Sequence, residues 1–225
     1  MPRRTKEDAL ATRSQLLDAA ECVFSEKGVA RTSLNDIAQQ AGVSRGAIYW
    51  HFTNKADVFN AMMDRVTLPM EDALNQSEHQ PHPDYLSALV GAMLDAVRKI
   101  ATDVHTRRVF EVATHKVEFI DELVAIKDRQ VKNHLKIVTQ VQKAMQEACA
   151  ARGLPPLTQP TALAYGLFAL VLGLVQNWLL MPDAFDLPLT AEIALASYLA
   201  GLGLETQTTC NVTLSDPPGM PNGTL

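Results

Sequence analysis

Apolar residues recur at every third or fourth position along most of the chain, which is the spacing of amphipathic α-helices. This spacing predicts helices over residues 7–27, 55–76, 85–100, 105–118 and 121–153, and the first and last of these end at a glycine. Two further predicted helices, over 161–181 and 190–204, are apolar around most of their surface. With two short helices inside residues 33–52, the pattern predicts an all-α chain of about nine helices.

The two short helical patterns meet at a tight corner. Ser33 with Asp36 three residues later predicts a capping box at the start of the first helix. Gly42 supplies the left-handed conformation that ends it, and Ser44 is a good N-cap for the second. Two helices joined by a short turn that contains glycine form the helix-turn-helix motif of DNA-binding proteins.

The second short helix has the composition of a surface that approaches DNA. Arg45, Tyr49 and Trp50 are predicted to project outward, with the small residues Gly46 and Ala47 between them. Small residues let the backbone approach a groove, and arginine and tyrosine can reach base edges and phosphates. The alternative is that Tyr49 and Trp50 pack on neighbouring helices.

The motif and the helix before it share many residues at fixed spacing with a known family. These are Thr12, Leu16, Ala19, Phe24, Gly28, Thr32, Ile37, Ala38, Ala41, Gly42, Val43, Ser44, Gly46, Tyr49, His51, Phe52 and Lys55. With them, about the first quarter of the chain resembles the DNA-binding domain of the TetR family of bacterial transcriptional regulators. The run ARTSLNDIAQQAGVSRGAIYWHFTNK is most similar to the AcrR/TtgR/MtrR-like branch, which represses multidrug efflux pumps.

The resemblance implies a dimeric, cytoplasmic bacterial repressor that binds a near-palindromic operator and is released from it by a small hydrophobic or aromatic inducer. It implies that the helix over 55–76 moves when ligand binds. It also implies a groove-facing set, Arg45, Gly46, Tyr49 and Trp50, and a phosphate-binding set, Thr32, Ser33, Ser44, Tyr49, His51 and Lys55.

The net charge of −5 conceals an uneven distribution. Residues 1–55 hold eight Lys or Arg against six Asp or Glu, a net charge of +2, and the remainder carries −7. DNA affinity depends on the local basic face, so an acidic second domain is compatible with DNA binding. The three widely separated cysteines allow no disulfide framework or zinc site, which fits a reducing cytoplasm.

Composition divides the chain into segments. We expect a DNA-binding domain over 1–54, a connecting helix over 55–76, a ligand-binding and dimerisation domain over 84–205, and a disordered tail over 206–225. The basic start of the chain either contacts DNA or is a solvated terminus. His79 and His82 in the polar break near residue 80 have a spacing that suits metal, but we interpret them as part of a solvated loop, and we expect no metal or cofactor.

The predicted helix over 161–181 contains no charged residue and is long enough to span a membrane. Polar residues interrupt it and no basic cluster flanks it, so we favour a buried helix that packs between subunits, with no membrane contact. Small residues recur on one face of this helix and of the predicted helix over 190–204. The expected dimer interface comprises Ala162, Gly166, Ala169, Gly173, Ala196, Ala200 and Gly203.

An inducer pocket is expected among the helices that follow residue 84. Methionine and phenylalanine suit a permissive pocket because they accommodate ligands of several shapes. The alternative is that these side chains fill a solid core. The expected lining comprises Val66, Met70, Leu89, Met93, Phe110, Thr114, His134, Val138, Val141, Phe168, Val171 and Gln176.

Other functions are weaker hypotheses. An all-helical enzyme would need a catalytic motif, and the sequence shows no phosphate-binding glycine loop, nucleophile elbow or metal motif. A membrane-anchored DNA-binding protein remains an alternative because of the apolar run at 161–181. A transcriptional activator with the same fold is a further alternative, since fold class alone does not decide the direction of regulation.

Overall fold

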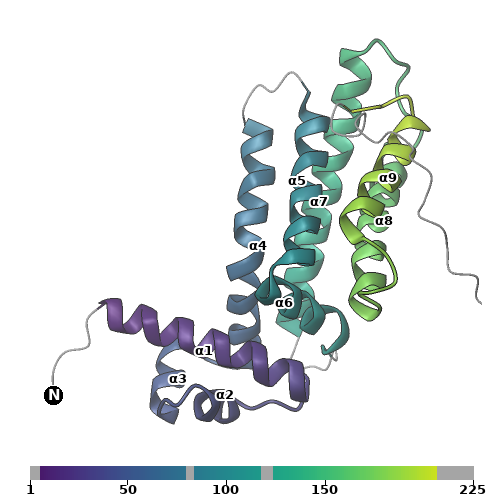
Figure 1. Cartoon of the computed structure of the whole chain (residues 1–225). Coiled ribbons are helices and arrows are strands. Elements are labelled where there is room, and N and C mark those ends of the chain that lie inside the picture. The colour runs from purple at the N-terminus through teal and green to yellow at the C-terminus, as the bar shows by residue number, and fades with distance from the viewer. Residues whose placement is uncertain (1–5, 80–83, 118–123, 207–225) are drawn as a thin grey trace, which may run out of the picture.

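The computed structural model describes residues 6–79, 84–117 and 124–206, without the side chains of residues 73–79. Within these ranges the chain is helical (Figure 1), as the apolar spacing predicts. Helices α1 to α3 lie together at one end of the molecule, and α4, α5, α7, α8 and α9 stand side by side above them. The elements are α1 (Lys6–Lys27), α2 (Leu34–Gln40), α3 (Arg45–His51), α4 (Lys55–His79), α5 (Tyr85–Thr102), α6 (Val104–His115), α7 (Val124–Ala151), α8 (Pro160–Leu180) and α9 (Leu187–Ala200).

The corner between α2 and α3 forms as predicted. The Ser33 hydroxyl accepts a hydrogen bond from the Asp36 amide, and the Asp36 carboxylate accepts one from the Ser33 amide, which completes the capping box. Gly42 adopts a φ of +67°, which a residue with a Cβ rarely adopts. The Ser44 hydroxyl then accepts a hydrogen bond from the Ala47 amide and starts α3.

The N-terminal core extends beyond α1, α2 and α3. Phe24 of α1 and Phe59 of α4 are buried, with their ring centroids 6.3 Å apart. The same cluster includes Val109 of α6 and Ile126 of α7. The predicted boundary at residue 54 is therefore not a break in packing, because one apolar cluster holds the N-terminal helices against α4, α6 and α7.

Helix α4 is longer than the predicted 55–76. It continues through Pro69 and runs from Lys55 to His79. Proline has no backbone N–H, so α4 lacks the hydrogen bond that would join residue 69 to the carbonyl of Arg65. The helix nevertheless runs unbroken from the end that holds α1 to α3 up alongside α5 (Figure 1).

Two helices in the C-terminal half begin earlier than predicted because aspartates cap them. The Asp103 carboxylate accepts a hydrogen bond from the Thr106 amide 2.8 Å away, so α6 starts at residue 104. The Asp186 carboxylate accepts one from the Leu189 amide at 2.9 Å, and Pro188 is compatible with the first turn of α9. Helix α9 ends at residue 200, before Gly203, whose φ is +69°.

The capping box makes a pH-dependent contribution to stability. Hydrogen bonds from Lys27 and then Ser33 hold the pKa of Asp36 well below its usual value of 3.8. A carboxyl whose pKa is lower in the folded than in the unfolded state stabilises the fold above pH 3.8. That contribution declines as the pH falls from 3.8 towards the folded-state pKa.

We therefore expect Asp36→Asn to lower the free energy of unfolding by about 1 kcal/mol at neutral pH, as cap removal does. The difference from wild type should shrink as the pH falls below 3.8. Urea unfolding at pH 7 and at about pH 3 measures both quantities. A difference that stays constant across this range would contradict a role for the Asp36 charge.

Candidate DNA-binding surface and ligand cavity

The outward face of α3 has the composition predicted for a DNA-binding surface. Trp50 is 72% exposed and Tyr49 is 51% exposed, although both are large aromatic side chains. The guanidinium of Arg45 lies 5.5 Å from the centroid of the Tyr49 ring. A Cβ placed on Gly46 would meet nothing closer than the Ser44 hydroxyl at 3.9 Å, so the backbone here is open to a partner. The alternative that Tyr49 and Trp50 pack on neighbouring helices does not fit this exposure.

Two of the predicted phosphate-binding side chains already have structural roles at helix starts. The hydroxyls of Ser33 and Ser44 cap α2 and α3, and both residues are exposed. His51, at the end of α3, is partly buried, and its ring meets the Trp50 ring edge-on at 4.5 Å. These contacts fix the aromatic pair at the end of α3.

Thr32 and Lys55 require a correction. Both side chains are buried, which the expected role as exposed phosphate contacts does not allow. The Thr32 hydroxyl donates to the Gly28 carbonyl at 2.7 Å, and the Lys55 ammonium donates to the Ala30 carbonyl at 2.7 Å. The Lys55 bond therefore fastens the loop between α1 and α2 to α4, and the Thr32 bond closes a turn within that loop. Sequence spacing could not reveal the Ala30 partner, which is 25 residues away from Lys55.

A cavity of about 440 Å³ lies among α4, α5, α6, α7 and α8. Its size falls within the range of small-molecule sites, which is about 300–1,000 Å³. Apolar side chains dominate the lining, and polar groups are present from several helices. The structure brings together eight of the predicted pocket residues here: Met70, Met93, Phe110, Thr114, His134, Phe168, Val171 and Gln176.

Four predicted pocket residues do not line this cavity. Leu89, Val138 and Val141 are buried in the core between α5, α7, α8 and α9, and Val66 is buried in the N-terminal cluster. For these four the solid-core alternative is correct. Helical periodicity identifies an inward face, but it does not indicate which part of that face meets another side chain and which meets empty space.

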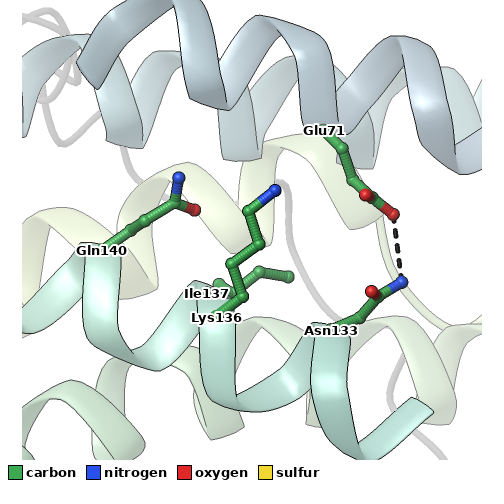
Figure 2. A pocket seen from close by; sticks show the side chains of 5 residues that line it. All are labelled: Glu71, Asn133, Lys136, Ile137 and Gln140. Atoms are coloured by element: carbon green, nitrogen blue, oxygen red, sulfur yellow. Dashed lines mark hydrogen bonds between the residues drawn. The ribbon is translucent and has the colours of Figure 1, made fainter. Parts of the chain in front are cut away.

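Sequence reasoning missed a polar wall formed by α4 and α7. The Asn133 amide donates to the Glu71 carboxylate at 3.0 Å (Figure 2), and the Arg129 guanidinium donates to the Thr67 hydroxyl at 3.1 Å. All four residues line the cavity. Arg129 lies four residues before Asn133 and therefore shares its side of α7.

An aromatic group stands at the α7–α8 side of the cavity. The His134 ring meets the Phe168 ring edge-on, with the centroids 4.7 Å apart, and it lies 5.7 Å from the Tyr165 ring. Flat side chains of this kind form favourable contacts with aromatic ligands. The cavity therefore combines a polar wall on one side with aromatic and aliphatic surface on the other.

Ion pairs connect the cavity wall to the N-terminal helices. Arg129 also pairs with Asp64 of α4, and the neighbouring Arg65 pairs with Asp18 and Glu21 of α1. Glu21 is fully buried. Its second carboxylate oxygen lies 3.1 Å from the Nδ1 atom of His105 in α6. Asp64 thus pairs α4 with Arg129 at the cavity wall, and the next residue, Arg65, pairs α4 with α1.

The predicted dimer-forming helices expose apolar surface in the isolated chain. Helix α8 is long and apolar enough to cross a membrane by length and composition, yet only 28% of its most apolar window is buried. Ala162, Ala169 and Ala200 are exposed, and Ala196 and Gly173 are partly exposed. A Cβ placed on Gly173 would meet nothing within 4 Å. These residues therefore lie at a surface that a second chain can cover.

Gly166 and Gly203 differ from the other small residues of the predicted interface. A Cβ on Gly166 would lie 2.6 Å from the Tyr198 hydroxyl, which donates to the Leu163 carbonyl. Gly166 therefore allows α9 to pack on α8 within one chain. Gly203 lies after the end of α9 in a left-handed conformation, so its lack of a side chain serves a turn.

Comparison with known proteins identifies both halves of the chain. Residues 16–62 match the family described as bacterial regulatory proteins, tetR family. Residues 84–203 match the C-terminal region of MAATS-type transcriptional repressors. The second match covers α5 to α8 of the cavity and the helices of the predicted dimer interface, while α4, which also lines the cavity, lies before it.

The chain is similar over most of its length to characterised bacterial regulators. It is 39% identical over 187 residues to the HTH-type transcriptional regulator TtgR of Pseudomonas putida, a match that covers 83% of this chain and 89% of TtgR. It is 33% identical over 201 residues to the HTH-type transcriptional repressor BepR of Brucella suis, covering 89% of this chain and 96% of BepR.

Solved structures have the same fold. NalD, the secondary repressor of the MexAB-OprM multidrug efflux pump in Pseudomonas aeruginosa, superposes with a TM-score of 0.77 at 36% identity, covering 86% of this chain and 96% of NalD. The complex with triclosan of SmeT, the repressor of the Stenotrophomonas maltophilia pump SmeDEF, gives a TM-score of 0.78 at 29% identity. That match covers 94% of this chain and 99% of SmeT.

Proposed function

Because this chain belongs to the TetR family of bacterial regulatory proteins, we propose that it is a cytoplasmic, dimeric repressor of a multidrug efflux operon. A hydrophobic or aromatic inducer releases it from a near-palindromic operator. The observation that carries this proposal is that α4 joins the exposed α3 surface to a cavity of about 440 Å³. The relatives NalD and SmeT, which repress efflux pumps, support the choice of target genes.

In the DNA complex, α3 enters the major groove with its open side. Arg45 reads a base edge, and Tyr49 and Trp50 contact the groove wall or the backbone on either side of Gly46. The exposed Ser33 and Ser44 lie at the starts of α2 and α3, where backbone amides favour phosphate oxygens. The side chains of Thr32 and Lys55 are left out of the contact set because they are bonded inside the chain.

The dimer forms through α8 and α9. An uncharged helix with most of its apolar window exposed is stabilised when a second copy covers it, and a two-fold pair of α8–α9 hairpins would make a four-helix interface. The two α3 helices of such a dimer meet successive major grooves about 34–36 Å apart. This geometry favours a subunit interface over a membrane span, and it explains why the operator is near-palindromic.

Induction follows from linkage between the two sites. A ligand weakens DNA binding only if it binds the DNA-incompetent arrangement more tightly, and DNA must then weaken ligand binding by the same factor. A ligand that contacts Thr67 touches α4 itself, and one that contacts Arg129 touches the partner of Asp64. Arg65, the residue after Asp64, holds α1. The described side chains thus provide a set of bonds from the cavity wall through α4 to α1.

Two alternatives fit the chain less well. An all-helical enzyme is disfavoured because the chain matches transcriptional regulators over nearly the whole length of those relatives. An activator would use the same DNA-binding surface and the same cavity, and it is disfavoured because the relatives described by their mode of action are repressors. A reporter fused to the regulated promoter distinguishes the two, since deletion of a repressor raises expression.

Arg45→Ala is expected to weaken binding to the DNA upstream of the gene that encodes this protein. The expected loss is about tenfold, because a bidentate arginine–guanine contact contributes about 1–3 kcal/mol. Binding to unrelated DNA should change much less. Arg98→Ala removes an exposed arginine from α5 and serves as the matched control. An electrophoretic shift assay at constant salt measures the affinities of wild type and both variants for each DNA. Equal operator binding by Arg45→Ala and wild type would remove the base-reading role.

Gly173→Leu is expected to dissociate the dimer while preserving the fold, because the added side chain meets nothing in its own chain. Gly166→Leu should instead lower the thermal midpoint, since its Cβ would clash with the Tyr198 hydroxyl. Sedimentation velocity at low micromolar concentration reports the assembly, and circular dichroism reports the fold. A Gly173→Leu protein that sediments as an intact dimer would exclude this face of α8 from the interface.

Val171→Trp is expected to fill the cavity and abolish induction while operator affinity stays near the wild-type value. Gln146→Trp adds the same ring to an exposed position on α7 and is the control. Calorimetry with triclosan, the ligand of SmeT, measures ligand affinity with and without operator DNA. Wild type should bind triclosan more weakly when operator is present. Equal affinity in both conditions would show that the two sites are not coupled.

A further inference from the structure

A second depression lies on the outside of the molecule, between α4 and α5. It is an open groove of about 440 Å³. Its outer part is formed by Pro69, Asp95 and Lys99, all of which are exposed. Small residues form the wall on the α5 side, and a Cβ placed on Gly91 would meet nothing within 4 Å. The proposed function assigns no role to this groove.

The groove and the ligand cavity share a wall. Met70, Ala92 and Ala96 line both of them, so these side chains stand between the cavity and the outside of the molecule. Ala92 and Ala96 are fixed and short. Met70 is the long member of the three, and its unbranched thioether chain can adopt several rotamers at little cost. A change of rotamer at Met70 alone would therefore open a passage between the groove and the cavity.

The backbone beside Met70 is also easier to deform than a regular helix. Pro69 lacks the N–H that would bond to the Arg65 carbonyl, and its ring crowds the preceding turn. Bends in helices concentrate at such positions. The weakest point of α4 thus lies next to the side chain that separates the groove from the cavity.

A route between α4 and α7 is the alternative. Figure 2 shows the small space there, which is lined by Glu71, Asn133, Lys136, Ile137 and Gln140. Its volume is about 10 Å³, far below that of the groove between α4 and α5. The hydrogen bond between Asn133 and Glu71 crosses this space, so ligand passage here would require a broken polar contact as well as side-chain movement.

From these observations we propose that inducers enter and leave the cavity through the groove between α4 and α5, past Met70. This inference rests on the proposed function of the cavity. Passage through this route moves the middle of α4, the helix that also carries the bonds to α1. The groove is a path, so blocking it should change the rates of binding and release and leave the equilibrium affinity unchanged.

The test uses the full-length protein and the neutral fluorescent probe N-phenyl-1-naphthylamine in stopped-flow measurements. Gly91 lines the groove and not the cavity, so Gly91→Phe fills the groove from α5 and replaces no residue of the cavity lining. We expect association and dissociation rates to fall together by about tenfold or more, which is a rise in the barrier of about 1.4 kcal/mol. The dissociation constant should match that of wild type.

Two further variants keep the test decisive. Ala88→Phe fills the same groove one turn earlier and replaces Gly91→Phe if that protein does not fold. Lys136→Phe places an equal ring at the space between α4 and α7 and should leave both rates unchanged. Slower exchange in Lys136→Phe with normal exchange in the groove variants would overturn the proposal in favour of the α4–α7 route.

The remaining outcomes separate the route from the cavity. Weaker equilibrium binding in Gly91→Phe, with no decrease in the association rate, would make the groove part of the binding site and overturn its role as a path. Unchanged rates in both groove variants would also overturn it, provided that wild type binds the probe and Val171→Trp does not. Probe binding that Val171→Trp leaves intact would overturn the cavity assignment, and the route with it.

Discussion

A carboxylate removed from water must be neutralised by its neighbours, and Glu21 imposes this requirement on three helices. It is fully buried in α1, and its partners are Arg65 of α4 and His105 of α6. A buried ion pair contributes little net stability, but the loss of one partner leaves an uncompensated charge and is strongly destabilising. Burial alone would lower the pKa of Arg65, yet hydrogen bonding to Asp18 and the charge of Glu21 raise it. Charge pairing with α4 and a hydrogen bond with α6 therefore hold α1 in place, in addition to apolar contact.

Helix α4 meets this constraint on one side and the ligand cavity on the other. Successive residues of an α-helix point in directions about 100° apart, so Asp64 and Arg65 can pair with different neighbouring helices from the same turn. Asp64 pairs with Arg129 at the cavity wall, and Arg65 pairs with α1. A ligand that displaces Arg129 therefore acts within one residue of the bond that positions α1. Pro69, one turn further along, leaves the carbonyl of the same Arg65 without its helical hydrogen bond. The missing hydrogen bond of α4 thus falls on the residue that holds α1.

Local features of the fold were predictable from sequence because they depend on residues three or four positions apart. The capping box of Ser33 and Asp36 and the left-handed Gly42 needed no knowledge of distant contacts, and both were confirmed. The caps at Asp103 and Asp186 follow the same rule and were overlooked, which displaced the starts of α6 and α9. The roles of Lys55 and Glu21 were not predictable, because their partners are distant in sequence and burial turns an ordinary surface residue into a structural one.

The candidate site shows where pattern reasoning loses resolution. Met93 and Leu89 lie on the same inward face of α5, yet Met93 borders the cavity and Leu89 is packed in the core. The difference comes from the neighbouring helices, which leave a gap beside one residue and fill the space beside the other. Gly166 and Gly173 likewise repeat on α8, but Tyr198 covers Gly166 within the chain, whereas Gly173 remains uncovered. A small residue records that something approaches closely, and only the packing of the chain distinguishes an internal helix from a second subunit. The proposed interface is therefore defined more sharply by what the chain leaves uncovered than by the spacing of its glycines.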